Sequence, residues 1–163
     1  MNYFKTLTML AVPAISLSLT SCSKDYEEYM EAATSLSKDA ASVLNSCLDV
    51  EDADDAADKL MKLTKKMESL KKDFLCSYVD DVRSRIYKPD LDDSAQREAL
   101  NYINKKHKDI QDSHREMNLQ WKSAVKRINE NEQLSKQRYL NYAIERFNYE
   151  YEYLMNRSEI IGS

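Results

Sequence analysis

The sequence is nearly devoid of glycine and proline. Its 163 residues include one Gly and two Pro, whereas an average protein has about 7% Gly and about 5% Pro. β-Sandwiches and barrels need Gly, Pro or Asn-Gly at their hairpins, and dinucleotide folds and P-loops need several glycines to bring the backbone close to phosphate. The shortage excludes these classes. With 32% charged residues, the chain is instead typical of long amphipathic helices.

A concentrated basic face is also missing. The chain has 24 Lys and Arg against 28 Asp and Glu, a formal net charge of −4. Its lysine clusters are interleaved with acids and therefore predict solvated helix faces. Because nucleic-acid-binding proteins need a basic patch or stripe, we expect no nucleic-acid partner.

The first 21 residues have the layout of a secretory signal peptide. Lys5 is the only charged residue before Lys24, and an apolar run of 13 residues extends from Leu7 to Leu19. This run is too short to span a bilayer, which takes about 20 residues, but it suits the hydrophobic region of a secretory signal. A cysteine, Cys22, follows three residues after the run ends.

The tetrapeptide Leu19-Thr20-Ser21-Cys22 resembles the lipobox of bacterial lipoproteins. The resemblance is confined to residues 1–25, and no family is recognised for the rest of the chain. It implies cleavage after Ser21, a diacylated Cys22 sulfur and an acylated new amino terminus. Residues 1–21 are then the signal peptide, residues 22–25 a lipidated tether and residues 26–163 a single helical domain. The alternative is an ordinary signal peptide that happens to contain a cysteine.

The lipoprotein resemblance also implies a location. Two acyl chains anchor a protein stably to a membrane, and the residue after Cys22 is Ser23 rather than Asp. In lipoproteins of enteric bacteria this pattern resembles release to the outer membrane. The following Lys24-Asp25 and Glu27-Glu28 are similar to surface-export signals of another bacterial group. We expect a lipid-anchored protein of the cell envelope, in the outer membrane rather than the inner one, with surface exposure left open.

Apolar residues recur at helical spacing along the rest of the chain. Three stripes, at residues 26–50, 56–86 and 100–128, proceed in steps of three and four, as a buried helix face does. One turn is expected near residues 50–52, where five carboxylates at 51–58 fit the N-terminus of the second helix and lack the Gly of a calcium loop. The second helix should end near Tyr87, because Pro89 disfavours helix just before it.

The last segment, residues 94–160, has two interpretations. Its start is marked by Asp93 and Gln96, which resemble a capping box. The polar patch at 129–132 contains neither Gly nor Pro, and a new apolar stripe from Leu140 to Leu154 points nearly opposite to the third stripe. Either a tight turn near Asn131 starts a fourth helix, or one long helix changes partners. The helix formers in the patch favour the long helix.

The sequence therefore predicts an all-α protein. We expect an elongated antiparallel bundle or coiled coil of three long helices, the last of them split into two in the alternative. Cys47 and Cys76 should be free thiols, because they lie on opposite sides of the first turn and about 36 Å separates Cys76 from it along the second helix. A disulfide needs Cα atoms within about 7 Å.

No residue pattern predicts catalysis. The only two histidines, His107 and His114, share one heptad position about 10.5 Å apart and lack the spacing of a metal-chelating pair. We interpret them as residues at the edge of the buried stripe that form hydrogen bonds or face water. No Ser or Cys lies in a nucleophile motif. We expect no enzyme, no metal and no cofactor. The alternative is a carrier that holds an apolar ligand or haem near His107, Met117 and Trp121.

A row of tyrosines near the C-terminus gives the best indication of function. We define the tyrosine face as Tyr139, Tyr142, Arg146, Tyr149 and Tyr153. Tyrosine offers a large contact area at low entropic cost and is enriched at interfaces. We expect this face to bind a protein partner or a second copy of the chain; the alternative is that the rings line a groove within the bundle. The predicted function is a non-enzymatic structural or protein-binding module tethered through Cys22.

Overall fold

The computed structural model describes residues 24–87, 92–116 and 119–155, and these residues form helices without a strand. The expected all-α class is confirmed. The elements in chain order are α1 (Tyr26–Ser46), α2 (Ala53–Asp73), the π-helix η1 (Phe74–Val79), α3 (Asp80–Ile86), α4 (Asp93–Glu116), α5 (Leu119–Glu130), the 3-10 helix η2 (Leu134–Lys136) and α6 (Arg138–Met155).

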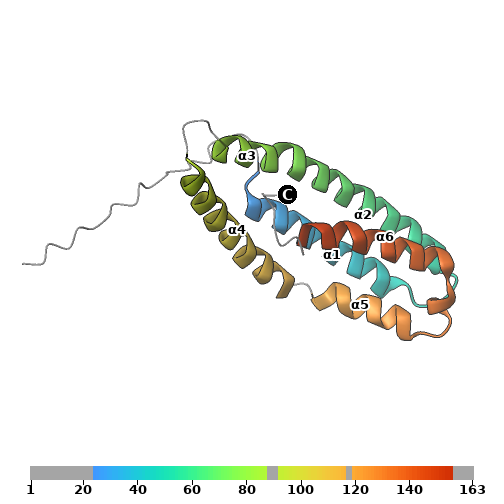
Figure 1. The fold of residues 1–163 in the computed structure, drawn as a ribbon. Helices are drawn as coiled ribbons and strands as arrows, with labels where there is room; N and C mark the ends of the chain where they lie inside the picture. Colours follow the sequence, from blue (N-terminus) through green and yellow to red (C-terminus); the bar gives the residue numbers. More distant parts are fainter. Residues whose placement is uncertain (1–23, 88–91, 117–118, 156–163) are drawn as a thin grey trace, which may run out of the picture.

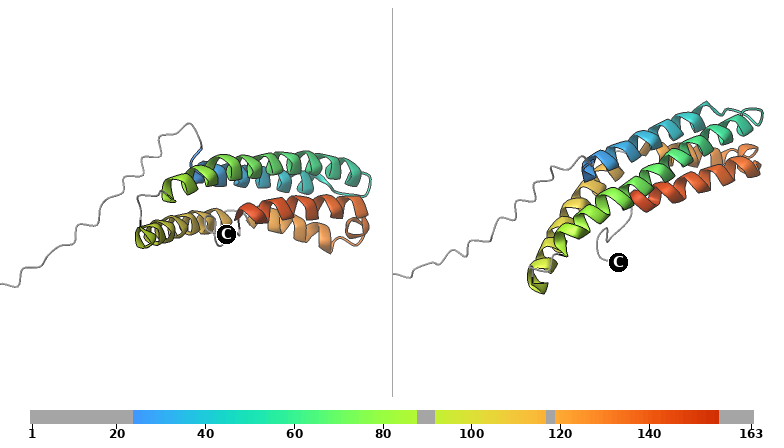
Figure 2. Two further views of the ribbon diagram at one scale, coloured as in Figure 1. Left: turned by 45° about the horizontal axis from the view of Figure 1, so that its top comes forward. Right: turned by 90° about the horizontal axis from the view of Figure 1, so that it is seen from above.

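The helices pack in two layers. One layer holds α1 and the continuous run of α2, η1 and α3, and the other holds α4, α5 and α6 (Figure 2). Helix α6 packs mainly along α2, whereas α1 contacts α2, α4, α5 and α6. The α1–α2 turn and the α5–α6 turn lie at the same end of the molecule (Figure 1). At the other end, α3 and the beginning of α4 extend past the start of α1 (Figures 1 and 2).

Helix α1 is buried on more of its surface than its apolar stripe predicts. Of that stripe, Leu36 and Val43 are only half-buried and Val50 is exposed. Because α1 has neighbours on several sides, a second set of its residues is buried as well: Met30, Thr34, Ser37, Ala41 and Leu44.

The second stripe is buried along its whole length, as predicted. It comprises Ala56, Leu60, Leu63, Met67, Leu70, Phe74, Tyr78, Val82 and Ile86. Its last four steps, from Leu70 to Ile86, are all four residues long. Because an α-helix has 3.6 residues per turn, repeated steps of four would move these side chains gradually off one face. The π-helix η1 compensates for this rotation, because its i→i+5 hydrogen bonds place more residues in each turn. The spacing of the stripe indicates the rotation, but it does not predict the π-helix.

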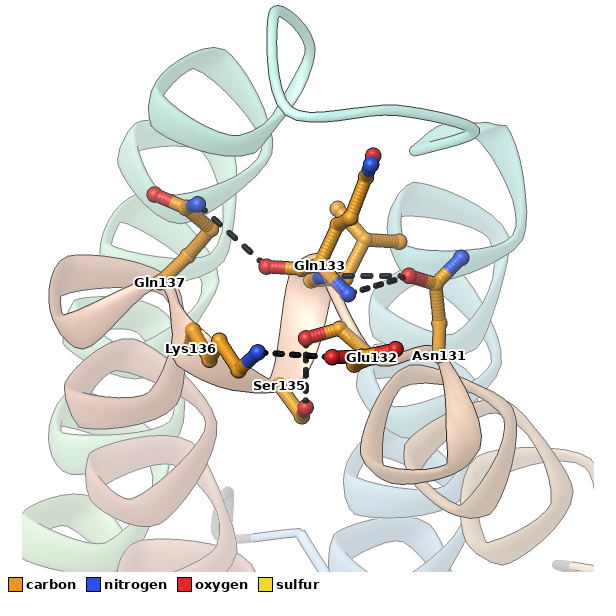
Figure 3. A network of polar contacts seen from close by, with 7 residues as sticks. Asn131, Glu132, Gln133, Ser135, Lys136 and Gln137 are labelled. Atoms are coloured by element: carbon orange, nitrogen blue, oxygen red, sulfur yellow. Dashed lines mark hydrogen bonds and ion pairs between the residues drawn. The ribbon is translucent and has the colours of Figure 1, made fainter.

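The preference for one long final helix is wrong. Helix α5 ends at Glu130, α6 begins at Arg138, and the chain reverses between them. Figure 3 shows how the turn closes without glycine: the Asn131 side-chain oxygen accepts hydrogen bonds from the backbone amides of Gln133 and Leu134, both at 3.0 Å. Leu134 is fully buried and anchors the turn. Side-chain capping and this burial override the helix propensity of the patch.

The other turns are close to their predicted places. Helix α1 ends at Ser46 and α2 begins at Ala53, with Asp54 and Asp55 in its first turn, so the acidic run does lie at a helix N-terminus. Helix α3 ends at Ile86. The cap of α4 is one residue earlier than predicted, because Asp92 rather than Asp93 accepts from the Ala95 amide, at 2.8 Å.

Two helix ends are closed by side chains from other helices. The Arg127 guanidinium on α5 donates to the carbonyls of Leu44 and Cys47 at the end of α1, the latter at 3.0 Å. Gln111 and Arg115 on α4 donate to the carbonyls of the last two residues of α6, both at 3.0 Å. In many proteins the last carbonyl groups of a helix are instead satisfied through a Gly that follows the helix.

Several predictions lie outside the described residues, namely the signal peptide with Cys22, and Met117. Cys47 and Cys76 are free, as predicted; the first is buried and the second is exposed. In the part of the chain that the structure describes, no helix combines the length and apolarity needed to cross a membrane.

Candidate functional site

The tyrosine face lies on α6, along its seam with α2. Tyr139, Tyr142 and Tyr149 are 43%, 51% and 61% exposed, and Arg146 and Tyr153 are half-buried. Helix α6 presents these residues outward because its opposite stripe is buried, as predicted: Leu140, Ile144, Phe147, Tyr151 and Leu154.

Polar contacts tie two members of the face to α2. The Tyr139 hydroxyl donates to the Asp58 carboxylate at 2.7 Å, and this hydrogen bond raises the pKa of the tyrosine. The Arg146 guanidinium pairs with Glu68 at 2.7 Å. These contacts hold Tyr139 and Arg146 against α2, while the Tyr142 and Tyr149 side chains remain more than half exposed.

A cationic pair lies against the rings at the other end of the face. The Lys71 ammonium is 5.7 Å from the centroid of the Tyr149 ring and 4.8 Å from that of Tyr153. The Arg146 guanidinium carbon is 5.9 Å from the Tyr149 centroid. Such cation–π contacts stabilise ring positions, so the tyrosines are held in place before any partner arrives.

Glu150 organises both cations. It is 3% exposed, accepts a hydrogen bond from Lys71 and lies 3.6 Å from Arg146. A carboxylate this deeply buried needs such partners. Sequence reasoning missed Glu150, Lys71, Asp58 and Glu68; the i,i+4 spacing of Arg146 and Glu150 is the one signal of this network within a single helix.

The arrangement offers a contact surface. Exposed tyrosine rings supply apolar area, and their hydroxyls supply hydrogen bonds. Tyr139 and Arg146 pair with α2, while the rings of Tyr139, Tyr142 and Tyr149 remain exposed. The binding of a partner by this face stays a prediction.

The two histidines are separate, and each contacts a hydroxyl group. His107 Nε2 lies 2.6 Å from the Tyr78 hydroxyl, and the His107 ring stacks on Tyr26 with centroids 3.9 Å apart. His114 Nδ1 lies 3.1 Å from the Thr34 hydroxyl. Burial lowers the pKa of His107 to about 4. Within the described ranges, no cluster of His, Cys, Asp and Glu is suited to hold a metal ion.

A groove that sequence reasoning missed runs between α5 and α6. Its volume is about 670 Å³, and its apolar lining comprises Trp121, Val125 and Ile144. The Trp121 indole donates to the Asn148 side chain at 3.1 Å. The lining includes neither histidine, so the residues of the expected carrier site are not brought together around this groove.

Comparison with known proteins assigns no family and no function to the chain. No protein-family model matches the chain, and neither a curated protein nor a solved structure is detectably similar to it.

Proposed function

We propose that the protein is a lipid-anchored component of the bacterial cell envelope that binds a protein partner through the tyrosine face and catalyses no reaction. Cleavage after Ser21 leaves Cys22 as the acylated residue, and residues 22–25 tether an elongated antiparallel helical bundle to the membrane. The outer membrane is the proposed location. The signal-like run and the lipobox resemblance of residues 7–22 support the anchor.

The exposure of the tyrosine face supports the binding role. Eight large hydrophobic side chains are exposed among the described residues, and three of them lie on this face of α6: Tyr139, Tyr142 and Tyr149. Exposed aromatic residues that are clustered and held in place are typical of binding hot spots. The charged groups of the seam, Glu68 and Arg146, suit a polar rim. The partner is another envelope protein or a second copy of this chain.

The carrier alternative gains no specific support. The His107 ring nitrogen that would ligate a haem already contacts Tyr78, and the ring face is covered by Tyr26. We therefore propose no second function.

Fractionation of the Cys22→Ala variant tests the anchor. The wild-type protein should sediment with membranes and incorporate labelled fatty acid, and the variant should do neither, because its acylated sulfur is gone. Membrane association of the variant equal to that of the wild type would refute the lipoprotein assignment.

Photocrosslinking in intact cells tests the tyrosine face. A photoreactive residue at position 142 or 149 should give a discrete protein adduct. Position 48 is the control, because Leu48 is 70% exposed but lies in the α1–α2 turn. The same adducts from all three positions, or none from positions 142 and 149, would contradict the proposal. Tyr142→Ala with Tyr149→Ala should abolish partner binding while the circular dichroism spectrum stays unchanged.

A further inference from the structure

The tyrosine face continues onto α2 as a row of side chains that are exposed or half-buried. We define the α2 row by its steps of three and four residues, which keep it on one side of the helix: Asp54, Asp58, Met61, Lys65, Glu68 and Lys72. Asp58 accepts a hydrogen bond from Tyr139, and Glu68 pairs with Arg146. These contacts place the row beside the tyrosine face. They also show that α2 and α6 run side by side in the same direction (Figure 2).

The α2 row changes charge along its length. Asp54 and Asp58 are exposed at its first end. The hydrogen bond to Asp58 is the main cause that raises the pKa of Tyr139, and the charge of Asp54 adds to it, so both acids lie near that ring. Lys65 and Lys72 are exposed toward the other end, where the acid of the row, Glu68, is already paired. Within the described part of the chain, the side chains of Asp54, Lys65 and Lys72 have neither an ion pair nor a hydrogen bond.

The outer side of α6 shows the reverse order of charge. Arg138 is exposed four residues before Tyr142, and Glu145 is exposed three residues after it, followed by the half-buried Glu152. No ion pair or hydrogen bond of the Arg138 or Glu145 side chain is found among the described residues. The combined surface of α2 and α6 therefore has unpaired charges of both signs, separated along the helices, with Tyr142 and Met61 between them.

Such a surface is complementary to a second copy of itself. Position 63 lies midway between Asp54 and Lys72, and the contacts of Asp58 and Glu68 with α6 place it level with Tyr142. A two-fold axis that crosses both helices at this level brings Asp54 of each copy to Lys72 of the other. The same axis brings Tyr142 against Tyr142. An interface of this kind uses the same surface patch on both subunits.

The same axis also matches the remaining groups. On α6 it brings Arg138 of one copy close to Glu145 of the other. It places the Arg146 guanidinium opposite the Tyr139 ring, a cation–π pairing. A parallel copy, with α2 of one molecule over α6 of the other, would instead set Lys65 against Arg146 at the same level. Like charges at this distance repel, so the antiparallel arrangement is favoured.

The size of the surface indicates how tightly a copy would bind. From Asp54 to Lys72 the row is about 27 Å long, and two adjacent helices are roughly 20 Å wide. The contact would cover roughly 500 Å² of each molecule, below the roughly 800 Å² per partner of a standard stable complex. We therefore expect a reversible dimer with a dissociation constant in the micromolar range.

We propose that a second copy of the chain occupies the tyrosine face, packed antiparallel about a two-fold axis at Tyr142. Aromatic rings form the centre of this interface, and ion pairs between Asp54 and Lys72 close it on both sides. The inference rests on the proposed binding role of the tyrosine face and names its partner. It does not depend on the lipid anchor.

Disulfide crosslinking of the full-length chain tests the axis. Tyr142→Cys is made with Cys76→Ser, which removes the exposed native thiol, and mild oxidation should give a covalent dimer. Tyr149→Cys is the control, because Tyr149 is 61% exposed against 51% for Tyr142 yet lies about 20 Å from its own copy across the axis. A disulfide needs Cα atoms within about 7 Å. The Cys76→Ser protein gives the background. Equal yields at both positions, or no dimer above background at position 142, would overturn the inference.

Charge reversal tests the ion pairs. In the Tyr142→Cys protein, Asp54→Lys or Lys72→Asp alone should weaken the dimer about tenfold, because two symmetry-related pairs change from attraction to repulsion. Both changes together should restore it. Asp55→Lys is the matched control, since Asp55 lies in the same first turn of α2 but pairs with Lys59. Failure of the double variant to recover, or an equal loss from Asp55→Lys, would refute the proposed pairing.

Photocrosslinking separates this inference from the proposed function. Adducts of positions 142 and 149 with a different protein, in cells where position 142 gives no disulfide dimer, would retain the binding role and refute the second copy as partner. The absence of any adduct and of any dimer would refute both.

Discussion

His107 is held neutral by its surroundings in the core. Its ring contacts the Tyr78 hydroxyl and stacks on Tyr26. Burial is the main cause that lowers its pKa to about 4, and the charge of Lys106 adds to the effect. An ordinary histidine has a pKa of about 6.5. The unfolded chain therefore takes up a proton at a higher pH than the folded protein does.

We expect the free energy of unfolding to fall by about 2 kcal/mol between pH 7 and pH 5 through His107 alone. The contribution is complete above the unfolded pKa of about 6.5 and decreases toward the folded pKa, because protonation there favours the unfolded chain. Urea unfolding of the wild type and of His107→Phe at both pH values measures it. The variant is less stable at each pH but should lose about 2 kcal/mol less on acidification. An equal loss of unfolding free energy in the two proteins would contradict the lowered pKa of His107 and its attribution to burial.

At the scale of the helical elements, η1 keeps the apolar residues of the second stripe on one buried face of the helix. Phe74, Tyr78 and Val82 are separated by four residues each, yet all three are buried. A π-turn behaves as an α-helix with one inserted residue, so the positions after it keep the orientation they would have without the insertion.

Deletion of Cys76 from η1 should therefore be tolerated. Cys76 is exposed, and its removal lets a regular α-helix present Tyr78, Val82 and Ile86 to the same core. We expect the unfolding free energy to change by less than about 2 kcal/mol. The matched control is deletion of the exposed Lys62 in α2, which rotates all later residues by about 100° and should abolish cooperative unfolding. Thermal unfolding followed by circular dichroism compares the two; equal damage would show that η1 absorbs no extra residue.

Helices with a single apolar stripe at helical spacing were predictable from the sequence. The stripes of α2 and α6 are buried as expected, because a helix with one dominant neighbouring layer needs only a single apolar face. The second buried face of α1 was not predictable, since it depends on how many helices surround α1. The turn at residues 131–137 was missed because Asn131 and Leu134 act through a side-chain cap and a buried anchor, which are weak signals beside the helix propensity around them.

The candidate site was predictable to a similar degree. The tyrosine face follows from spacing within α6 alone. Its contacts with Asp58, Glu68 and Lys71 required knowledge that α6 packs along α2. Stripes show which side of a helix is buried but not which helix covers it.

At the scale of the whole molecule, α4 is attached differently from the other helices. Among the residues of α4 whose burial the structure describes, the buried ones are one isoleucine and three polar side chains: Ile103, His107, Gln111 and His114. Its remaining apolar contacts, Ala99, Leu100 and Ile110, are only half-buried. Because apolar burial is the main stabilising contribution, α4 has less of it than α2 or α6.

Native-state hydrogen exchange should therefore show α4 opening before α2. Local opening free energies follow local packing, so the amides of α4 should exchange at a lower free energy than those of residues 56–70. The gap should widen at pH 5, where protonation of His107 opposes its burial. Mass spectrometry of peptic fragments measures both helices in one sample. Identical exchange free energies throughout the protein would contradict the hierarchy.

The capping arginine on α5 has a consequence for the order of folding. Arg127 follows Leu44, whose carbonyl it caps, by 83 positions, and Gln111 precedes Leu154 by 43. A glycine cap acts as soon as its own helix is made. The Leu44 carbonyl has such a local partner as well, because it accepts from the Cys47 amide at 3.1 Å. In a chain that emerges amino terminus first, the second hydrogen bond, from Arg127, forms only after most of the protein has followed. Completion of the α1 end is therefore coupled to the packing of α5 and is a late event in assembly.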